Sequence, residues 1–263
     1  IGNRMHMPGI RIAALAACFA VLIPFGSAAQ ELINRDDGKR PTVVELFTSQ
    51  GCPQCPPADA FFETFADRDD VIALAWHVDY WDYIGWPDYF ASPACTARQK
   101  GYARATGARS IYTPQLVVGG SRVIGGAPAM LAADSILDRG GDRGGPGVQI
   151  ARDGDYVTVH LAPGPTMTAG QAGTNADAAL AGGVMADVSL VRYIPEATVE
   201  IERGENAGKT IRYRNIVTEW TSLGTWDGEK AVTMDTHVMG DLPLVVIVQA
   251  AGYGPIIAAA ALR

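Results

Sequence analysis

The segment VVELFTSQGCPQCPP, residues 43–57, joins an apolar run to a closely spaced pair of cysteines. The run is rich in β-branched residues, and we interpret residues 42–47 as a buried strand. A stretch with apolar side chains at helical spacing follows over residues 57–67 and predicts a helix. Cys52 and Cys55 therefore lie between a strand and the helix that follows it.

This place in a fold suits thiol chemistry. The thiolate is the reactive form of cysteine, and a helix N-terminus lowers the pKa of a thiol beside it. With two intervening residues, Cys55 can reach back and resolve a mixed disulfide formed on Cys52. Half of a zinc site has the same spacing, but the chain has no second C-x-x-C motif, so structural zinc is not expected. Because proline is poorly tolerated beyond a helix's first turn, we expect the regular helix to begin only near Pro56, which weakens the helix dipole at Cys52.

The chain beyond residue 67 continues to alternate between strands and helices. We expect a strand, a helix with an N-cap at Ser92, two strands joined by a Gly-Gly-Ser turn, and a last helix, at residues 71–78, 92–106, 115–118, 122–124 and 128–138. The predicted order over residues 41–139 is β-α-β-α-β-β-α, which is an α/β domain.

This order resembles the thioredoxin-like fold, in which a cis-proline stands before the third strand and faces the C-x-x-C pair. Thr113-Pro114 occupies that position. Cis bonds are only about 5–6% of X-Pro bonds in folded proteins, so the prediction of a cis Pro114 depends on the upstream cysteines. The resemblance implies that the backbone of Thr113 pairs with an extended substrate, and we add Tyr112 and Trp81 to the substrate-binding set.

Four further side chains are candidates for a role in the site. Glu45 lies in the first strand, and it either relays a proton to Cys55 as a buried carboxyl or faces solvent. Trp81 belongs to an aromatic segment, residues 76–90, that either binds a peptide or forms a lid and core packing. His77 either assists the thiols or is a hydrogen-bonded structural residue. Cys95 is either buried and inert or a reactive third thiol.

The C-terminal part has a different pattern. A Gly-rich stretch at residues 140–147 is typical of a linker, and residues 163–183 are interpreted as a long loop. Short strand-like runs with Gly-containing turns lie at 156–161, 184–193, 198–202, 210–218, 231–234, 244–249 and 256–260. They predict an antiparallel, all-β sandwich-like region over residues 148–263.

The N-terminus has the pattern of an export signal. Two arginines precede an apolar run at residues 12–25, and Ser27-Ala28-Ala29 follows it, as in a signal peptide with a small-residue cleavage site. The run is shorter than the roughly 20 residues that span a bilayer, and an uncleaved membrane anchor is the alternative. We expect residues 1–29 to be a cleaved signal peptide and the protein to be periplasmic or secreted, without stable membrane insertion.

Composition and charge indicate a globular protein and argue against one class of partner. The chain of 263 residues is 48% hydrophobic and carries a net charge of −7, which indicates a globular protein of one large or two ordinary domains. An acidic balance argues against nucleic acid as a partner, because a nucleic-acid binder needs a basic face. An exported chain meets oxidising conditions in which cysteines pair.

Three segments resemble a single family. They are VELFTSQGCPQCPPAD at residues 44–59, HVDYWD at residues 77–82 and YTPQ at residues 112–115. The motifs YRNIV at 213–217 and GTWDG at 224–228 resemble its C-terminal part. Together they are similar to the bacterial secreted proteins grouped as domain of unknown function 1223, which implies export and a thioredoxin-like fold but no assigned activity.

The sequence thus leaves three functional hypotheses. The first is an exported thiol–disulfide oxidoreductase that needs no cofactor and acts on protein or peptide thiols and disulfides, with a redox partner protein. The second is a non-enzymatic interaction protein with a structural Cys52–Cys55 disulfide. The third is a Cu(I)-binding module that uses Cys52, Cys55 and His77, because soft thiolates suit that ion.

Overall fold

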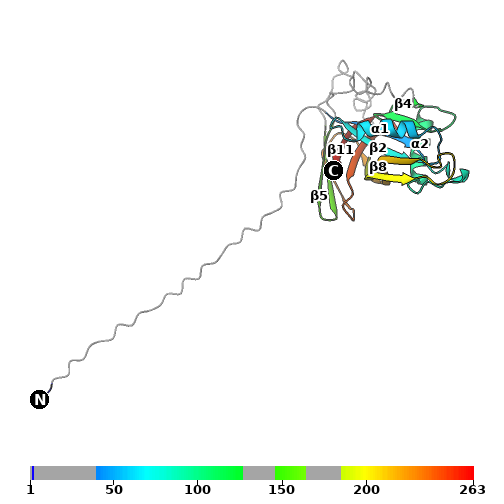
Figure 1. Cartoon of the computed structure of the whole chain (residues 1–263). Helices are drawn as coiled ribbons and strands as arrows, with labels where there is room; N and C mark the ends of the chain where they lie inside the picture. The colour runs from blue at the N-terminus through cyan, green and yellow to red at the C-terminus, as the bar shows by residue number, and fades with distance from the viewer. Residues whose placement is uncertain (1, 3–39, 127–145, 164–184) are drawn as a thin grey trace.

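The computed structural model describes residues 2, 40–126, 146–163 and 185–263 (Figure 1). These described residues form two α-helices, one 3-10 helix and two sheets. The helical elements are α1 (Pro56–Ala66), η1 (Asp82–Ile84) and α2 (Pro93–Ala105). The strands are β1 (Thr42–Thr48), β2 (Val71–His77), β3 (Gln115–Val118), β4 (Arg122–Gly125), β5 (Gly147–Asp153), β6 (Tyr156–Ala162), β7 (Ala186–Glu200), β8 (Thr210–Trp226), β9 (Val232–His237), β10 (Leu244–Ala250) and β11 (Ile256–Leu262).

One mixed sheet runs through both halves of the chain. Its eight strands follow the order β11-β10-β7-β8-β2-β1-β3-β4. β1 is parallel to β2 and antiparallel to β3, which forms a hairpin with β4. β8 joins β2 through the pairing of Ala75 with Ile216, and Asn215 Nδ2 donates to the carbonyl oxygen of Ala73 at 3.0 Å. The C-terminal strands are therefore a continuation of the first sheet.

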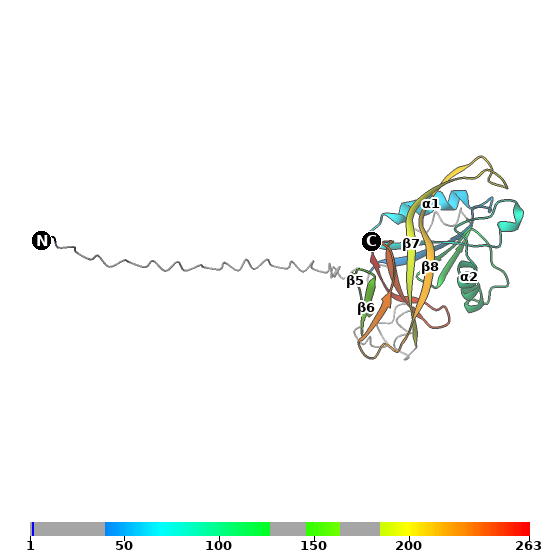
Figure 2. The same cartoon turned by 90° about the horizontal axis from the view of Figure 1, so that it is seen from below.

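This continuity corrects the prediction of a sandwich-like region that follows the α/β domain. A second antiparallel sheet exists, but it contains only β5, β6 and β9. It packs on the part of the large sheet formed by β7, β10 and β11 (Figure 2), where Val159 and Leu161 meet Leu190 and Val246 in one apolar cluster. The turn signals predicted individual strands but carried no information on which sheet each strand would join.

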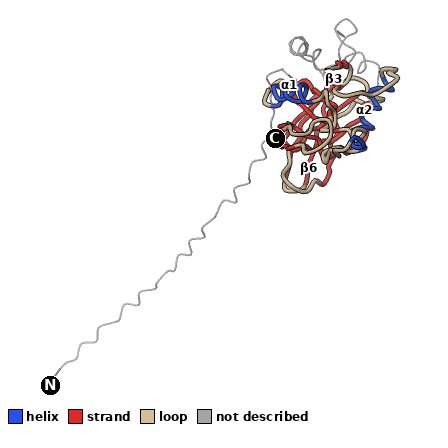
Figure 3. The backbone as a smooth tube through the Cα atoms, turned by 45° about the vertical axis from the view of Figure 1, so that its right-hand side comes forward, coloured by secondary structure: helices blue, strands red, loops and turns tan. Residues whose placement is uncertain are grey.

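The two helices cover opposite faces of the large sheet (Figure 3). Alternate residues of a strand point to opposite faces. In β1, Val44 and Leu46 pack with the phenylalanines of α1, while Val43 and Phe47 belong to the cluster that includes Tyr102 of α2. This alternation determines which polar side chains of β1 can approach the cysteines.

Most predicted elements of the first half are confirmed. The N-cap at Ser92 accepts a hydrogen bond from the Cys95 N–H at 3.2 Å, and β3 and β4 pair around the glycine turn as expected. In the C-terminal part, β5 was not predicted, and the runs at 184–193 and 198–202 form the single strand β7. The predicted helix at 128–138, most of the linker at 140–147 and of the loop at 163–183, and the signal peptide lie outside the described residues.

Among the residues that the structure describes, no helix is long and apolar enough to cross a membrane.

Candidate redox site

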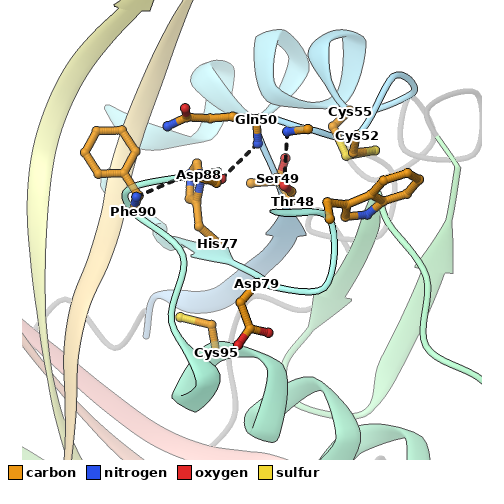
Figure 4. Close-up of polar contacts among 12 residues, drawn as sticks. Thr48, Ser49, Gln50, Cys52, Cys55, His77, Asp79, Asp88, Phe90 and Cys95 are labelled. Carbon is orange, nitrogen blue, oxygen red and sulfur yellow. Dashed lines mark hydrogen bonds and ion pairs between the residues drawn. A yellow bond between two sulfur atoms is a disulfide. The ribbon is translucent and has the colours of Figure 1, made fainter. Parts of the chain in front are cut away.

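Cys52 and Cys55 form a disulfide in the turn between β1 and α1 (Figure 4), with their Cα atoms 5.4 Å apart. The regular helix begins at Pro56 with Cys55 as its N-cap, as the prolines predicted. Cys52 lies one turn earlier, where its carbonyl oxygen accepts the Cys55 N–H at 3.2 Å. Both cysteines are fully buried, while Pro53 and Gln54 between them are exposed.

Two distant segments hold the chain around the disulfide. Asp88, in the loop before α2, accepts the Gln50 N–H at 2.8 Å. Asn206 lies in the loop between β7 and β8, a long antiparallel pair of strands visible in Figure 2. Its Nδ2 donates to the carbonyl oxygens of Gln50 at 2.9 Å and Cys52 at 2.8 Å. We call residues 201–209, between these strands, the hairpin tip. The tip contacts the cysteine turn through Asn206, and sequence reasoning missed this contact because it spans about 150 residues.

The Thr113–Pro114 peptide bond is cis, as predicted, and precedes β3. Trp81 joins this segment to the cysteine turn. Its Nε1 donates to Thr113 Oγ1 at 2.7 Å, and its Cβ lies 3.2 Å from the point where a Cβ on Gly51 would be. Tyr112 is 43% exposed. Trp81 therefore links the segment that contains Thr113 and Pro114 to the cysteine turn, and Tyr112 precedes that segment at the surface.

Glu45 is buried, so the alternative of a solvent-facing carboxylate is wrong. Its carboxyl forms a buried ion pair with Arg98 Nε at 2.6 Å and accepts a hydrogen bond from the Tyr102 hydroxyl. Glu45 alternates with Val44 and Leu46, so its side chain lies on the α2 face of the sheet. The cysteines and α1 lie toward the opposite face. A role for Glu45 in relaying protons to Cys55 thus finds no support in this geometry.

Asp59 is the buried acid on the α1 face. Its carboxyl accepts a hydrogen bond from Thr48 Oγ1 at 2.7 Å, and burial raises the pKa of Asp59 to about 7. Sequence reasoning passed over it, although a signal was present. Phe62 and Ala66 follow Asp59 by three and seven residues, so all three lie on one face of the helix, and this face is the buried one. An acidic residue is unexpected on an apolar, buried helix face.

His77 is a buried, hydrogen-bonded residue, as one of its two interpretations predicted. Its Nδ1 lies 2.7 Å from Asp88 Oδ2, and its ring packs edge-on against Phe90 and Tyr213. The described residues contain no group of three or more His, Cys, Asp or Glu side chains that could hold a metal ion. The proposed Cu(I) ligands Cys52, Cys55 and His77 are therefore not brought together as a site.

The aromatic segment divides between core and surface. Trp76 is fully buried, and Trp81 packs against the apolar cluster that contains it. Phe90 packs against a second cluster, which contains Tyr213. Tyr83 and Tyr89 are exposed by 83% and 64%. Cys95 is a free, buried thiol at the start of α2, away from the disulfide (Figure 4). Burial raises the pKa of Cys95, which makes its thiolate scarce and agrees with the inert interpretation.

Comparisons with known proteins agree with this architecture. The family model described as "Protein of unknown function (DUF1223)" matches residues 43–249. The crystal structure of a protein from Agrobacterium tumefaciens is 31% identical, with a TM-score of 0.65 over 84% of this chain and 93% of that chain. The structure titled HBP35 of Porphyromonas gingivalis is similar in fold, with 17% identity and a TM-score of 0.56 over 85% of this chain and 75% of that chain. No curated protein matches the chain. The protein belongs to the DUF1223 family.

Proposed function

We propose that this protein is an exported, thioredoxin-like thiol–disulfide oxidoreductase that exchanges its Cys52–Cys55 disulfide with protein or peptide thiols. The observation that carries the proposal is the placement of this disulfide in the turn between β1 and α1, with Cys55 as the N-cap of the helix. A thiolate formed on Cys55, the N-cap, is stabilised by the partial positive charge of the helix N-terminus, which makes Cys55 a good leaving group when Cys52 is attacked.

The arrangement of the surrounding strands supports the proposal. The order β2-β1-β3-β4, with β1 parallel to β2 and antiparallel to β3, agrees with the order expected of the proposed thioredoxin-like fold. α1 and α2 cover opposite faces of these strands, and Thr113–Pro114 precedes β3. Trp81 connects that segment to Gly51, next to Cys52.

The reaction needs no cofactor. A substrate thiolate attacks Cys52 Sγ, the Cys52–Cys55 bond breaks, and the electron pair leaves on Cys55 Sγ. This gives a mixed disulfide between the substrate and Cys52. A second substrate thiolate then attacks the substrate sulfur of the mixed disulfide, the bond to Cys52 breaks, and the electron pair leaves on Cys52 Sγ. The substrate is thereby oxidised to a disulfide and the site is reduced by two electrons, whereas return attack by Cys55 on Cys52 Sγ restores the starting disulfide without net transfer.

The burial of both cysteines sets a condition on this chemistry. A substrate sulfur can reach Cys52 only when the segments packed around the turn move, and Trp81 and the hairpin tip both contact this turn. The same burial favours the second candidate function, an interaction protein in which the disulfide is structural. The two functions differ in whether the disulfide exchanges with thiols in the folded protein.

A redox titration distinguishes them. The protein is equilibrated with glutathione buffers and alkylated, and the peptide that carries Cys52 and Cys55 is weighed by mass spectrometry. A reduction potential between about −120 and −270 mV is expected for an exchange site. A pair that stays oxidised below about −300 mV would show a structural disulfide and overturn the proposal.

Mixed-disulfide trapping tests the assignment of the two sulfurs. In Cys55→Ser, glutathione should stay attached to Cys52, because the resolving thiol is missing. In the matched variant Cys52→Ser, Cys55 should trap far less, because the proposal assigns it the resolving role and not the exchanging one. Cys95→Ala should behave like the wild type. Equal trapping in both serine variants would contradict the assignment of Cys52 as the exchanging sulfur.

A further inference from the structure

A group of polar side chains lies beneath the first turn of α1. Thr48 and His77 are register partners at the ends of the parallel strands β1 and β2. Leu46 of β1 and Ala75 of β2 pack in the apolar cluster under α1. Thr48 and His77 each lie two residues further along the same strand, and residues two apart face the same side of a sheet, so both side chains are on the α1 face. Figure 4 draws Thr48 and His77 below the turn that carries the disulfide.

Asp59 adds a carboxyl group from α1. Its N–H donates to the carbonyl oxygen of Cys55 at 2.9 Å, so the two residues are one helical turn apart on the same side of the helix. Side chains of a helix tilt toward its N-terminus, which brings the Asp59 carboxyl back toward the turn of Cys55. No other acidic residue lies in the first turn of α1.

The carboxyl of Asp59 is poorly solvated as an anion. The residue is only 4% exposed, Oδ1 accepts the Thr48 hydroxyl, and Oδ2 has no hydrogen-bond partner among the described residues. An ionised carboxylate offers about four acceptor positions, so the protonated form suits this site better. Glu45, in contrast, is engaged by Arg98 and Tyr102 on the other face of the sheet.

The charged groups around Asp59 come from four segments. His77 of β2 favours its ionised form, while Asp88 of the following loop and Glu63 of α1 oppose it. Tyr213 of β8 also interacts with Asp59, and its hydroxyl has no partner among the described residues. Burial is the largest effect, and together with Asp88 and Glu63 it outweighs the Thr48 hydrogen bond and His77 and raises the pKa of Asp59 to about 7.

We propose that Asp59 is the proton-exchange group of Cys55. The inference rests on the proposed exchange function. It names the residue that supplies and removes the proton of the buried Cys55 sulfur during exchange. When the Cys52–Cys55 bond breaks, the electron pair leaves on Cys55 Sγ as a thiolate. The Asp59 carboxylic acid gives its proton to that sulfur, directly or through one water molecule, and becomes a carboxylate next to His77.

The reverse reaction uses the same groups. The Asp59 carboxylate takes the proton of the Cys55 thiol, and the resulting thiolate attacks Cys52 Sγ of the mixed disulfide. The bond between Cys52 and the substrate breaks, and the substrate leaves as a thiolate. The proton therefore moves between Cys55 and Asp59, and no isolated anion has to persist at a sulfur removed from water.

The test measures the resolving step by itself. Phosphine-reduced protein is mixed with oxidised glutathione and quenched with acid at intervals. Mass spectrometry then counts the reduced, mixed-disulfide and oxidised forms from pH 5 to 9. In the wild type, the conversion of mixed disulfide to oxidised protein should accelerate through about pH 7. In Asp59→Asn this inflection should disappear, and the rate at pH 7 should fall about 100-fold.

Two further variants keep the test decisive. Asp67→Asn makes the same substitution at the exposed C-cap of α1 and should leave the profile unchanged. Thr48→Val keeps the carboxyl but removes its one hydrogen bond, so the inflection should move to higher pH. If Asp59→Asn and Thr48→Val both keep the wild-type rate and inflection, the assignment is wrong.

A direct titration separates this inference from the proposed function. The Asp59 carboxyl carbon is followed by NMR against pH in the oxidised protein and in the phosphine-reduced protein, without any substrate. Because a proton shared with Cys55 exists only in the reduced form, the titration should differ between the two. Identical curves would overturn the role of Asp59, even if exchange with glutathione occurs. If the titration of Asp59 differs between the oxidised and reduced protein but the disulfide does not exchange with glutathione, the oxidoreductase function alone is overturned.

Discussion

Asn206 Nδ2 lies 2.8 Å from the carbonyl oxygen of Cys52, although 154 residues separate them. The same amide group binds the carbonyl oxygen of Gln50. Asn206 is itself almost fully buried, and Lys209 Nζ donates to its Oδ1 at 2.8 Å. One side chain from the hairpin tip therefore satisfies two backbone acceptors of the redox turn.

Asn206→Ala should destabilise the protein and expose the disulfide. Two buried carbonyl oxygens lose their donor, which costs about 1–3 kcal/mol for an unsatisfied acceptor. Each 1.4 kcal/mol removed from the free energy of opening increases access about tenfold. We expect reduction of the disulfide by dithiothreitol to accelerate by at least about tenfold, measured by alkylation and mass spectrometry. Lys209→Ala keeps both amide contacts and should change the rate little. Equal reduction rates in wild type and Asn206→Ala would show that the hairpin tip does not limit access.

The pKa of Asp59 predicts a pH dependence of stability. Its folded-state pKa of about 7 is above its ordinary value of 3.8, so the unfolded chain ionises first. Stability from this group is complete below about pH 4 and is lost as the pH rises toward 7. The difference corresponds to about 4 kcal/mol. Urea unfolding of wild type and Asp59→Asn at pH 4 to 8 should show this decline only in the wild type. Parallel stability curves for the two proteins would contradict the burial of a titrating carboxyl.

The buried ion pair between Glu45 and Arg98 predicts a non-additive mutant pair. Arg98 also stacks on Trp76, Tyr102 and Trp220. Arg98→Met leaves the Glu45 carboxylate buried without its cation and should cost about 3–5 kcal/mol, whereas adding Glu45→Leu should recover most of this loss. Breaking the exposed pair Arg192–Glu219 by Glu219→Gln should cost less than about 1 kcal/mol. Urea denaturation of these variants provides the free energies, and additive losses for Glu45 and Arg98 would contradict direct coupling.

Gly101 allows α2 to pack against the loop after β10. A Cβ at this position would lie 2.2 Å from Tyr253 Cζ. Alanine normally stabilises a helix interior by about 1 kcal/mol relative to glycine, but here we expect Gly101→Ala to destabilise by about 1–3 kcal/mol through overpacking. In a Tyr253→Ala background, the same change should become neutral or stabilising. Thermal unfolding of the four proteins checks the sign, and a stabilising Gly101→Ala in the wild type would refute the contact.

The local parts of the fold could be predicted because their signals are local. Ser92-Pro93 marks a helix start, the glycine turn after β3 marks a hairpin, and the run before Cys52 marks a buried strand. Periodicity also placed both cysteines at a strand-to-helix turn. These signals act over a few residues and do not depend on what packs above them.

The parts that could not be predicted depend on distant partners. The side of the sheet that Glu45 faces follows from alternation with Val44, but its engagement by Arg98 required the position of α2. The role of Asn206 required the pairing of β7 with β8 and the direction of their hairpin. Sequence patterns describe what a segment can become, while sheet order decides which segments meet.

The pairing of β8 with β2 also determines the order in which the site is completed. A ribosome makes the chain from its N-terminus, so the two cysteines exist long before residues 201–209. During that interval no hairpin tip contacts them, so any oxidant that reaches the growing chain would meet an open dithiol. The disulfide can therefore be installed on the nascent chain and then enclosed when the last strands add to the sheet. In the folded protein, the hairpin tip then holds the turn around a bond that could form before the tip existed.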